Sequence, residues 1–350
     1  MRVLAIESSC DETAAAVVES GGRVLSDIVS SQIERHIPFG GVVPEVASRE
    51  HLERITDVVA QALAAAQLTL DDLDAIAVTT GPGLIGALFV GTMFAKGLAY
   101  GRGLPLISVN HLRGHLAASR LLSSPPPRPH VALLVSGGHT ALYRVDDANA
   151  IRTLGATLDD AAGEAFDKTA KMLGIPYPGG AALSRAAEGG NRHGVALPIG
   201  IPQKANLDFS FSGLKTAVRV HLQKARQTRG EHALDEQERR DLCASIEGAI
   251  VEALVSKAVR ACEREGLKDL VLAGGVAANG HLRERAQQAM VAIGGRAHAP
   301  PKQWCTDNAA MIGAAALEQL HAGAHEASTD GSRSRIISEL AVAPRAYWPL

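Results

Sequence analysis

Short apolar runs alternate with longer stretches of helical periodicity along most of this chain. Residues 74–80 and 105–109 are brief apolar runs bounded by turn residues, which is typical of buried strands. A glycine-rich turn at 40–41 leads into a helix that continues past residue 65, and residues 84–100 predict a largely apolar, buried helix. Strands that alternate with helices predict a doubly wound α/β lobe in the first half of the chain.

Two stretches share a design of apolar strand, polar turn and apolar strand. The first covers residues 3–19 and the second covers residues 131–145. Gly137 and Gly138 in the second turn let the backbone approach a phosphate closely and expose amide donors to it. Two similar hairpins, one opening each half of the chain, predict a duplicated fold with a ligand cleft between two lobes.

The first hairpin carries a group of polar side chains at its turn. These are Ser8, Ser9, Asp11, Glu12 and Thr13. Hydroxyls and backbone amides suit phosphate, whereas carboxylates suit a metal or an amine. A solvated hairpin tip is the alternative interpretation for this turn taken alone.

A proline-rich stretch marks the predicted lobe boundary. The three prolines at 125–127 cannot continue a helix or a central strand. We therefore expect a first lobe at 1–122 and a second lobe at 131–306. A helix at about 307–325 is expected to complete the first lobe, and residues 326–350 are expected to form a tail that does not bear on the chemistry.

The second half places polar residues beside glycine-rich turns. A helix is predicted at 159–174, followed by a rigid loop at 176–180 that could enclose a ligand. Residues 269–279 predict a strand, a Gly-Gly turn and an asparagine near a helix start, which suits a nucleoside or phosphate at the helix amino end. Asp307 opens an apolar helix, where capping the helix is the ordinary role of an isolated aspartate.

Charged residues dominate a predicted helical region at about 217–265. Its basic residues are Lys224, Arg226, Arg229, Arg239 and Arg240, interrupted by Glu231, Asp235, Glu236 and Glu238. This mixture indicates mainly a solvated face, with contact to RNA as the alternative.

His111 and His115 form the candidate metal site. Asn110 follows the apolar run at 105–109 and is a plausible N-cap for a helix from 111 to about 122. Two histidines four residues apart lie on one helix face, and neutral imidazoles one turn apart can both reach one ion. The pair also follows the carboxyl end of a strand, where open α/β sheets place their ligand sites.

Two comparisons sharpen this prediction. His321 and His325 have the same spacing, but Gly323 and the polar residues that follow indicate a fraying surface helix. At the first pair, Leu112 stands where zinc proteases of the H-E-x-x-H pattern carry their general-base glutamate. The first pair therefore lacks the base of that mechanism, and a third protein ligand must come from a distant part of the chain.

Composition narrows the class of protein. At 350 residues and 46% hydrophobic the chain can bury a large core, and no run approaches the roughly 18 apolar residues of a membrane span. The four cysteines show no CxxC spacing and the start shows no signal-peptide pattern, so we expect a reducing, cytoplasmic location. A formal net charge of −2 and an aromatic content of 3% argue against a protein that holds nucleic acid alone.

Ten motifs span nearly the whole chain. They are ESSCDETAAA at 7–16, GGVVPEVASREH at 40–51, GPGLIGAL at 81–88, NHLRGH at 110–115, LVSGGHT at 134–140, GEAFDK at 163–168, YPGG at 177–180, FSFSGLKT at 209–216, GGVAAN at 274–279 and CTDNAAM at 305–311. In this order they resemble the bacterial TsaD (Gcp, YgjD) family of tRNA N6-adenosine threonylcarbamoyltransferases, related to Kae-type proteins. The resemblance implies the two-lobed ASKHA fold of actin, Hsp70 and sugar kinases, an α/β fold of duplicated ribonuclease-H-like domains with a ligand cleft between them.

The resemblance also implies site residues. His111, His115 and Asp307 match the family's metal ligands, and a set of two histidines and one carboxylate suits Fe(II), with Zn(II) second. The positions that match those binding threonylcarbamoyl-AMP are Leu134, Val135, Ser136, Gly137, Gly138, Asp167, Gly180 and Asn279.

The implied reaction transfers threonylcarbamoyl from its adenylate to N6 of the adenosine 3′ of the anticodon in tRNAs reading ANN codons. Asp11 and Glu12 are candidate catalytic residues that handle the amine proton or shape the site. The implied partners are tRNA, a TsaB-like paralogue, a TsaE-like ATPase and a TsaC-type synthase that supplies the adenylate. A metal-dependent glycoprotein endopeptidase and a non-catalytic ATP-binding module are the alternatives.

Overall fold

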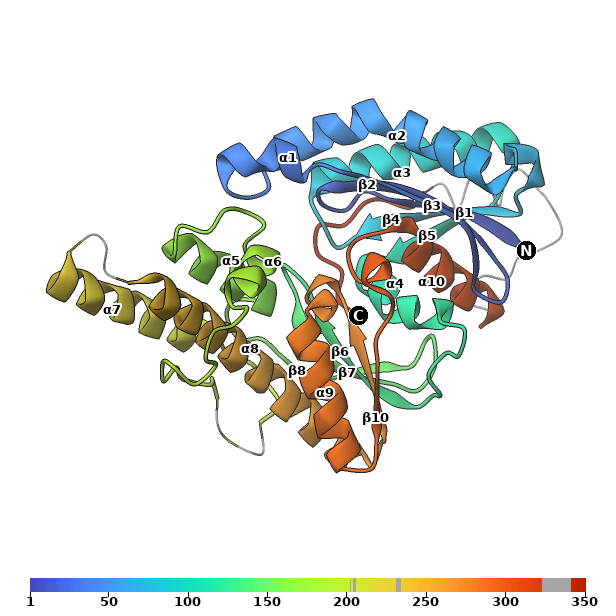
Figure 1. The fold of residues 1–350 in the computed structure, drawn as a ribbon. Helices are drawn as coiled ribbons and strands as arrows, with labels where there is room; N and C mark the ends of the chain where they lie inside the picture. Colours follow the sequence, from blue (N-terminus) through green and yellow to red (C-terminus); the bar gives the residue numbers. More distant parts are fainter. Residues whose placement is uncertain (202, 204–205, 231–233, 323–340) are drawn as a thin grey trace. The chain divides into compact units, whose positions relative to one another are not determined.

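Two five-stranded sheets form the two halves of this computed structural model, which describes residues 1–201, 203, 206–230, 234–322 and 341–350 (Figure 1). Each sheet belongs to a separate unit of the chain. Unit 1 holds Met1–Pro126, Asp146–Ile151 and Pro300–Leu350, and unit 2 holds Pro127–Val145 and Arg152–Ala299. The first division thus falls within the proline-rich stretch, and the C-terminal helix belongs to unit 1.

The sheet of unit 1 has the strand order β3-β2-β1-β4-β5. The strands are β1 Arg2–Glu7, β2 Glu12–Glu19, β3 Arg23–Ser31, β4 Ala75–Gly81 and β5 Leu106–Asn110. β1, β2 and β3 pair antiparallel, whereas β4 pairs parallel with both β1 and β5. The hairpin predicted at 3–19 is confirmed as β1 and β2.

Helices cover both faces of this sheet (Figure 1). They are α1 Ile33–His36, α2 Pro44–Ala66, α3 Ile85–Arg102, α4 His111–Ala117 and α10 Ala309–His321, with 3₁₀ segments η1 Ile37–Phe39, η2 Leu70–Asp72, η3 Ala118–Leu121 and η5 Lys302–Trp304. Side chains alternate along β1, so that Leu4 and Ile6 pack in the layer with α2 and α3. Val3 and Ala5 pack in the opposite layer, with α10.

The structure corrects two details of the predicted helices in unit 1. The helix expected to be buried at 84–100 leaves Ile85 and Phe89 about half exposed, at 54% and 55%. Lys96 is the one charged residue in the predicted span, so the hydrophobic pattern gave little indication of an outer face. The helix expected from 111 to about 122 is α-helical only to Ala117 and continues as a 3₁₀ turn. His321 is the last residue of α10, and His325 lies outside the described residues.

The sheet of unit 2 has the strand order β10-β9-β6-β7-β8. The strands are β6 His130–Val135, β7 Thr140–Val145, β8 Ile151–Ala156, β9 Asp269–Ala273 and β10 Arg296–His298. β6 pairs antiparallel with β7 and parallel with β9, as β1 does with β2 and β4 in unit 1. The two sheets therefore share one strand order, as the duplicated design predicts.

Unit 2 carries the remaining long helices. They are α5 Ala162–Met172, α6 Gly179–Ala186, α7 Ser212–Arg229, α8 Glu236–Glu265 and α9 Gly280–Ala292, with the 3₁₀ segment η4 Gly275–Ala278. The helix predicted from residue 159 begins only at Ala162, because Asp159 and Asp160 make tertiary contacts instead. Asp159 accepts a hydrogen bond from the Phe211 amide at 2.8 Å, and Asp160 pairs with Lys215.

Within the described residues, no helix has both the length and the hydropathy needed to cross a membrane.

The packing of α10 on β2 generates a stability prediction. A Cβ on Gly313 would lie 2.6 Å from Cγ2 and 2.9 Å from Cβ of Val18, whereas a Cβ on Gly97 in α3 would meet nothing within 4 Å. Gly313→Val should therefore lower the free energy of unfolding by about 1–3 kcal/mol more than Gly97→Val. Both changes put the same β-branched residue into a helix, so the difference isolates the packing. Equal urea midpoints for the two variants would contradict this packing.

Candidate metal centre and ligand-binding loops

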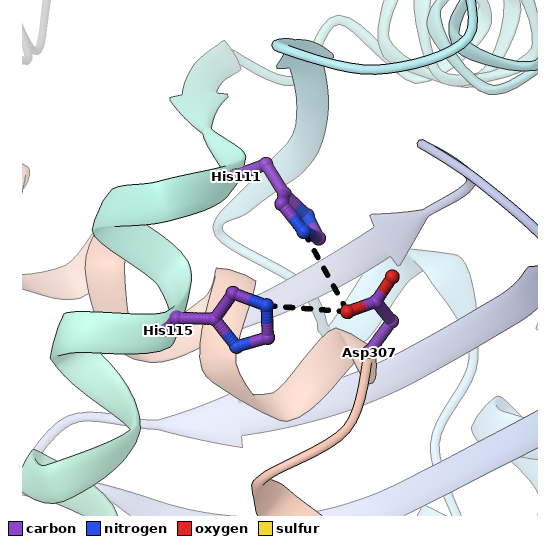
Figure 2. A group of neighbouring side chains, drawn as sticks. All are labelled: His111, His115 and Asp307. Carbon is purple, nitrogen blue, oxygen red and sulfur yellow. Dashed lines mark ion pairs between the residues drawn. The ribbon is translucent and has the colours of Figure 1, made fainter. Parts of the chain in front are cut away.

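Three side chains of unit 1 converge on one point (Figure 2). Oδ1 of Asp307 lies 3.2 Å from Nε2 of His115 and 3.5 Å from Nε2 of His111. One ligand atom from each residue can be chosen so that all three lie within 4.8 Å of one another. When ligand atoms each bind one ion at about 2.0–2.2 Å, the distances between those ligand atoms are similar to the distances found here. The three side chains can therefore hold a single metal.

Local sequence places the two histidines. Oδ1 of Asn110 accepts hydrogen bonds from the amides of Leu112 and Arg113 at 2.9 and 3.3 Å, which confirms Asn110 as the N-cap of α4. The helix therefore begins at His111 and brings His115 onto the same face one turn later, with ring centroids 4.7 Å apart.

Tertiary packing adds the aspartate. A Cβ on Gly114 would lie 2.6 Å from Cδ1 of Ile312, so α4 and α10 approach closely at this point. Asn308 caps α10 by accepting a hydrogen bond from the Met311 amide at 2.9 Å. The N-cap interpretation of Asp307 is therefore wrong, and its carboxylate faces the histidines instead.

The imidazole of His115 supports a metal as the missing partner. Its side chain is fully buried, and neither ring nitrogen has a hydrogen bond to the described residues. Nε2 is within ion-pair distance of Asp307, but it does not meet the geometry of a hydrogen bond. Leaving a buried polar nitrogen without a partner is costly, whereas a metal on the Nε2 lone pair would satisfy it. The residues fit a divalent ion, and two histidines with one carboxylate leave coordination positions open for substrate.

Glu7 orients the first histidine, and the sequence analysis did not single it out. Its fully buried carboxylate accepts hydrogen bonds from Nδ1 of His111 at 3.1 Å and from the Thr79 hydroxyl at 2.6 Å. A carboxylate on Nδ1 leaves Nε2 facing the metal position and fixes the ring. The available signal was a charged residue that ends an otherwise apolar strand.

The same contacts set the charges of this pair. Burial disfavours a charged His111, but the carboxylates of Asp307 and Glu7 outweigh it and raise the pKa of His111 to about 9. Burial likewise disfavours an ionised Glu7, but the neighbouring His111 lowers the pKa of Glu7 below its usual value. Without a metal, the two side chains therefore form a buried ion pair.

Asp11 and Glu12 lie at the tip of the first hairpin. Burial, and then the negative charges of Asp11 and Asp307, raise the pKa of Glu12 well above its usual value. The same three causes raise the pKa of the Cys10 thiol. A raised pKa makes a carboxylate a stronger base, so the surroundings of Glu12 suit a proton acceptor.

A buried histidine holds this turn in place. Nδ1 of His51 lies 2.8 Å from the Thr13 hydroxyl, and its Nε2 lies 2.9 Å from the carbonyl of Cys10. Burial lowers the pKa of His51, which favours the neutral ring. His51 therefore links α2 to the hairpin and has a structural role in the motif at 40–51.

The predicted phosphate loop of unit 2 follows β6. Leu134 and Val135 are fully buried strand residues, so their side chains belong to the core. The turn that follows exposes Gly137 and Gly138, and its ends are joined by a hydrogen bond from the Ser136 amide to the His139 carbonyl at 2.8 Å. Ligand contact at this motif is therefore available from the turn and from backbone groups.

The other predicted substrate residues of unit 2 are joined through α6. The Gly180 amide donates to Oδ1 of Asp167 at 3.1 Å. Nδ2 of Asn279 donates to Ser184 of the same helix and to Glu247, each at 2.9 Å. Oδ1 of Asn279 also caps α9, so this amide already has three protein partners.

The pKa of His111 generates a prediction for metal binding. A metal binds the neutral imidazole, and below pH 9 the neutral fraction falls about tenfold for each pH unit. The affinity of the metal-free protein for Zn(II) should therefore fall about tenfold from pH 8 to pH 7, measured by competition with a chelator. Asp307→Asn, which removes one of the charges that raise this pKa, should bind more weakly and with a shallower pH dependence. A wild-type affinity that does not change over this range would exclude a protonated His111.

Solved structures support the fold. Component A of (R)-2-hydroxyglutaryl-CoA dehydratase from Acidaminococcus fermentans is 15% identical, with a TM-score of 0.55 over 92% of this chain and 99% of that chain. Full-length HypF in its phosphate- and nucleotide-bound form is 12% identical, with a TM-score of 0.60 over 93% of this chain and 47% of that chain. These likenesses bear on fold alone, and they confirm the ASKHA architecture.

Sequence relatives are much more similar. A protein of Bordetella petrii is 52% identical over 92% of this chain and 92% of its own length, and one of Trichlorobacter lovleyi is 49% identical over 100% and 97%. Both are named tRNA N6-adenosine threonylcarbamoyltransferase. The TsaD family model, which carries the same description, matches residues 23–314. This chain therefore belongs to the TsaD family, the tRNA N6-adenosine threonylcarbamoyltransferases.

Proposed function

We propose that this enzyme transfers the threonylcarbamoyl group from threonylcarbamoyl-AMP to N6 of the adenosine 3′ of the anticodon in tRNAs reading ANN codons. The products are N6-threonylcarbamoyladenosine and AMP. The observation that carries the proposal is the group of two buried histidines, His111 and His115, with Asp307, placed beside a carboxylate of raised pKa in a chain of this family. The family does not favour the endopeptidase or the non-catalytic ATP-binding module.

The chemistry requires a polarised carbonyl and a proton acceptor. His111, His115 and Asp307 would hold one divalent ion, for which Fe(II) is the first choice and Zn(II) the second. When bound, the ion supplies Lewis-acid stabilisation of negative charge on a carbonyl or phosphate oxygen. Glu7 keeps His111 in the ligating orientation.

The protein's own carboxylates handle the proton. The N6 nitrogen attacks the carbamoyl carbon, the bond from that carbon to the phosphate oxygen breaks, and AMP leaves. Glu12 accepts the proton lost from N6, because its raised pKa makes it a stronger base than an ordinary carboxylate. Asp11 contributes to that raised pKa and so tunes the base.

Unit 2 is proposed to bind the adenylate. The turn at Ser136, Gly137 and Gly138 offers backbone amides to a phosphate. Asp167 and Gly180 are placed together by their hydrogen bond, as expected for one binding surface. A hydrogen bond from Asn279 to the nucleoside would replace one of its present bonds to Ser184 or Glu247.

We also propose that the enzyme acts in the cytoplasm within an assembly of a TsaB-like paralogue and a TsaE-like ATPase, supplied with adenylate by a TsaC-type synthase. Two observations favour an enzyme that binds tRNA together with partner proteins. The formal net charge of −2 is low for a protein that holds tRNA alone. Ile85, Phe89 and Met93 recur every four residues on α3 and are exposed, so they offer an apolar surface to a partner.

The proposal predicts the outcome of one transfer assay. Labelled threonylcarbamoyl-AMP and unmodified tRNA are incubated with the enzyme, with and without the paralogue and ATPase. His111→Ala should lower formation of modified adenosine by at least about 100-fold, because it removes a ligand of the Lewis acid. His321→Ala, a change to an exposed histidine at the end of α10, is the matched control and should keep wild-type transfer. The transferase would be falsified if wild type with its partners modified no tRNA while still binding nucleotide.

A further inference from the structure

Helix α7 has a charge unlike that of the chain as a whole. Its 18 residues include five Lys or Arg and no Asp or Glu, whereas the chain has a formal net charge of −2. From the sequence, acidic residues interrupt this basic region, which indicates mainly a solvated face with contact to RNA as the alternative. The structure allows that judgement to be tested residue by residue.

Among the residues that the structure describes, the ion pairs of α7 lie near its two ends. Lys215 pairs with Asp160, and Arg229 pairs with Glu238. Of the other acidic residues near it in sequence, Glu236 pairs with Arg240 on α8 and Asp235 caps that helix, while Glu231 lies outside the described residues. Among the described residues, Arg219 and Arg226 have no ion pair.

The two arginines share one exposed face. Leu214, Val218 and Ala225 are buried and anchor an adjacent side of α7. Arg219 and Arg226 are exposed and seven residues apart, which is two turns and about 10 Å along the helix. Lys224 is left out of this surface because it lines a cavity with Glu238 and Asp241.

We propose that Arg219 and Arg226 form a docking surface for the phosphate backbone of tRNA. The inference rests on the proposed function, which requires an RNA substrate. A guanidinium suits phosphate because it is always charged and donates hydrogen bonds in a fork. Contacts to phosphate position the RNA without reading its sequence, which fits a surface without exposed aromatic side chains among the described residues of α7.

The test compares Arg219→Ala/Arg226→Ala with Arg264→Ala/Arg296→Ala. The control removes the same charge from two exposed arginines of unit 2, in the last turn of α8 and in β10. Affinity for unmodified tRNA and transfer rates are measured in the full assembly at several salt concentrations. Loss of two phosphate contacts should reduce the slope of log affinity against log salt by about 1.4–1.8 and raise KM for tRNA about tenfold.

The remaining readouts separate docking from catalysis. KM for the adenylate, and kcat at saturating tRNA, should be those of wild type, and the control should match wild type throughout. An unchanged salt slope in the Arg219 and Arg226 variant would overturn the docking surface while leaving the transferase intact. A wild-type assembly that binds tRNA without transferring to it would instead overturn the proposed function.

A second inference concerns residues 345–348, which we call the C-terminal strap. The Arg345 amide donates to the Thr80 carbonyl at 2.7 Å, and Nδ2 of Asn110 donates to the Trp348 carbonyl at 2.9 Å. A Cβ on Gly81 would lie only 2.1 Å from the Arg345 carbonyl oxygen, so β4 approaches the strap where only glycine fits. The tail expected to be irrelevant to the chemistry thus contacts the N-cap of the metal-binding helix.

We infer that the strap is a positioning element for the metal ligands. Asn110 uses Oδ1 to start α4 and Nδ2 to bind the strap, so the strap fixes the side chain that fixes His111. The guanidinium of Arg345 lies 5.1 Å from the centre of the Trp348 ring, which stabilises the strap itself.

Two changes and their combination test the strap. Asn110→Ser keeps an N-cap oxygen but loses the donor to Trp348, and a chain ending at residue 340 loses the strap. Each of these two changes should weaken Zn(II) binding about tenfold. The variant that combines them should bind Zn(II) no more weakly than the shorter chain alone. Tyr347→Ala, at a side chain 82% exposed, is the control and should bind as wild type. Wild-type affinity in the shorter chain, or effects that add fully, would overturn the inference.

Discussion

The close packing of α4 against α10 is the interaction on which the candidate metal site depends. Gly114 and Gly313 let α10 approach both α4 and β2, and a Cβ at either position would be within 3 Å of a neighbouring side chain. Because α10 packs on α4, Asp307 lies next to His111 and His115, which precede it by almost two hundred residues. The ligand set is therefore a product of helix packing, and its geometry depends on residues that have no polar group of their own.

Charge balance at the site follows from burial. Glu7 and Glu12 lie where ionised groups are poorly solvated, and the negative charge of Asp307 acts to raise the pKa of both. His111 supplies the one positive charge when the site holds no metal, because two carboxylates raise its pKa. The same excess of negative charge that raises the pKa of Glu12 would attract a divalent cation, so metal affinity and basicity share one cause.

The exposed side chains of one helix in unit 1 differ in chemical character from those of one helix in unit 2. In unit 1, α3 exposes apolar side chains, whereas in unit 2, α7 exposes arginines without ion pairs among the described residues. Apolar exposure suits a protein partner and unpaired arginines suit phosphate. A chain that is acidic overall can therefore contribute locally to RNA binding while leaving part of the electrostatic work to its partners.

The sequence by itself determined the elements and the family, because those depend on neighbouring residues and on ordered motifs. Apolar runs located β1, β2, β4, β5, β6 and β9, and the spacing of His111 and His115 located two candidate metal ligands next to a correctly predicted N-cap. Ten motifs in order identified the family and, through it, Asp307 as the candidate third ligand.

Only the tertiary structure decided contacts between distant residues, which leave no periodic trace in the sequence. The structure shows that Asn308 caps α10 and that Glu7 accepts a hydrogen bond from His111. It also shows that one face of the largely apolar α3 is exposed and that α5 begins at Ala162. It also brought Trp348 to Asn110 and showed which arginines of α7 lack an ion pair among the described residues. In each case an element is set by local preference, whereas a side chain's role is set by the neighbours that packing provides.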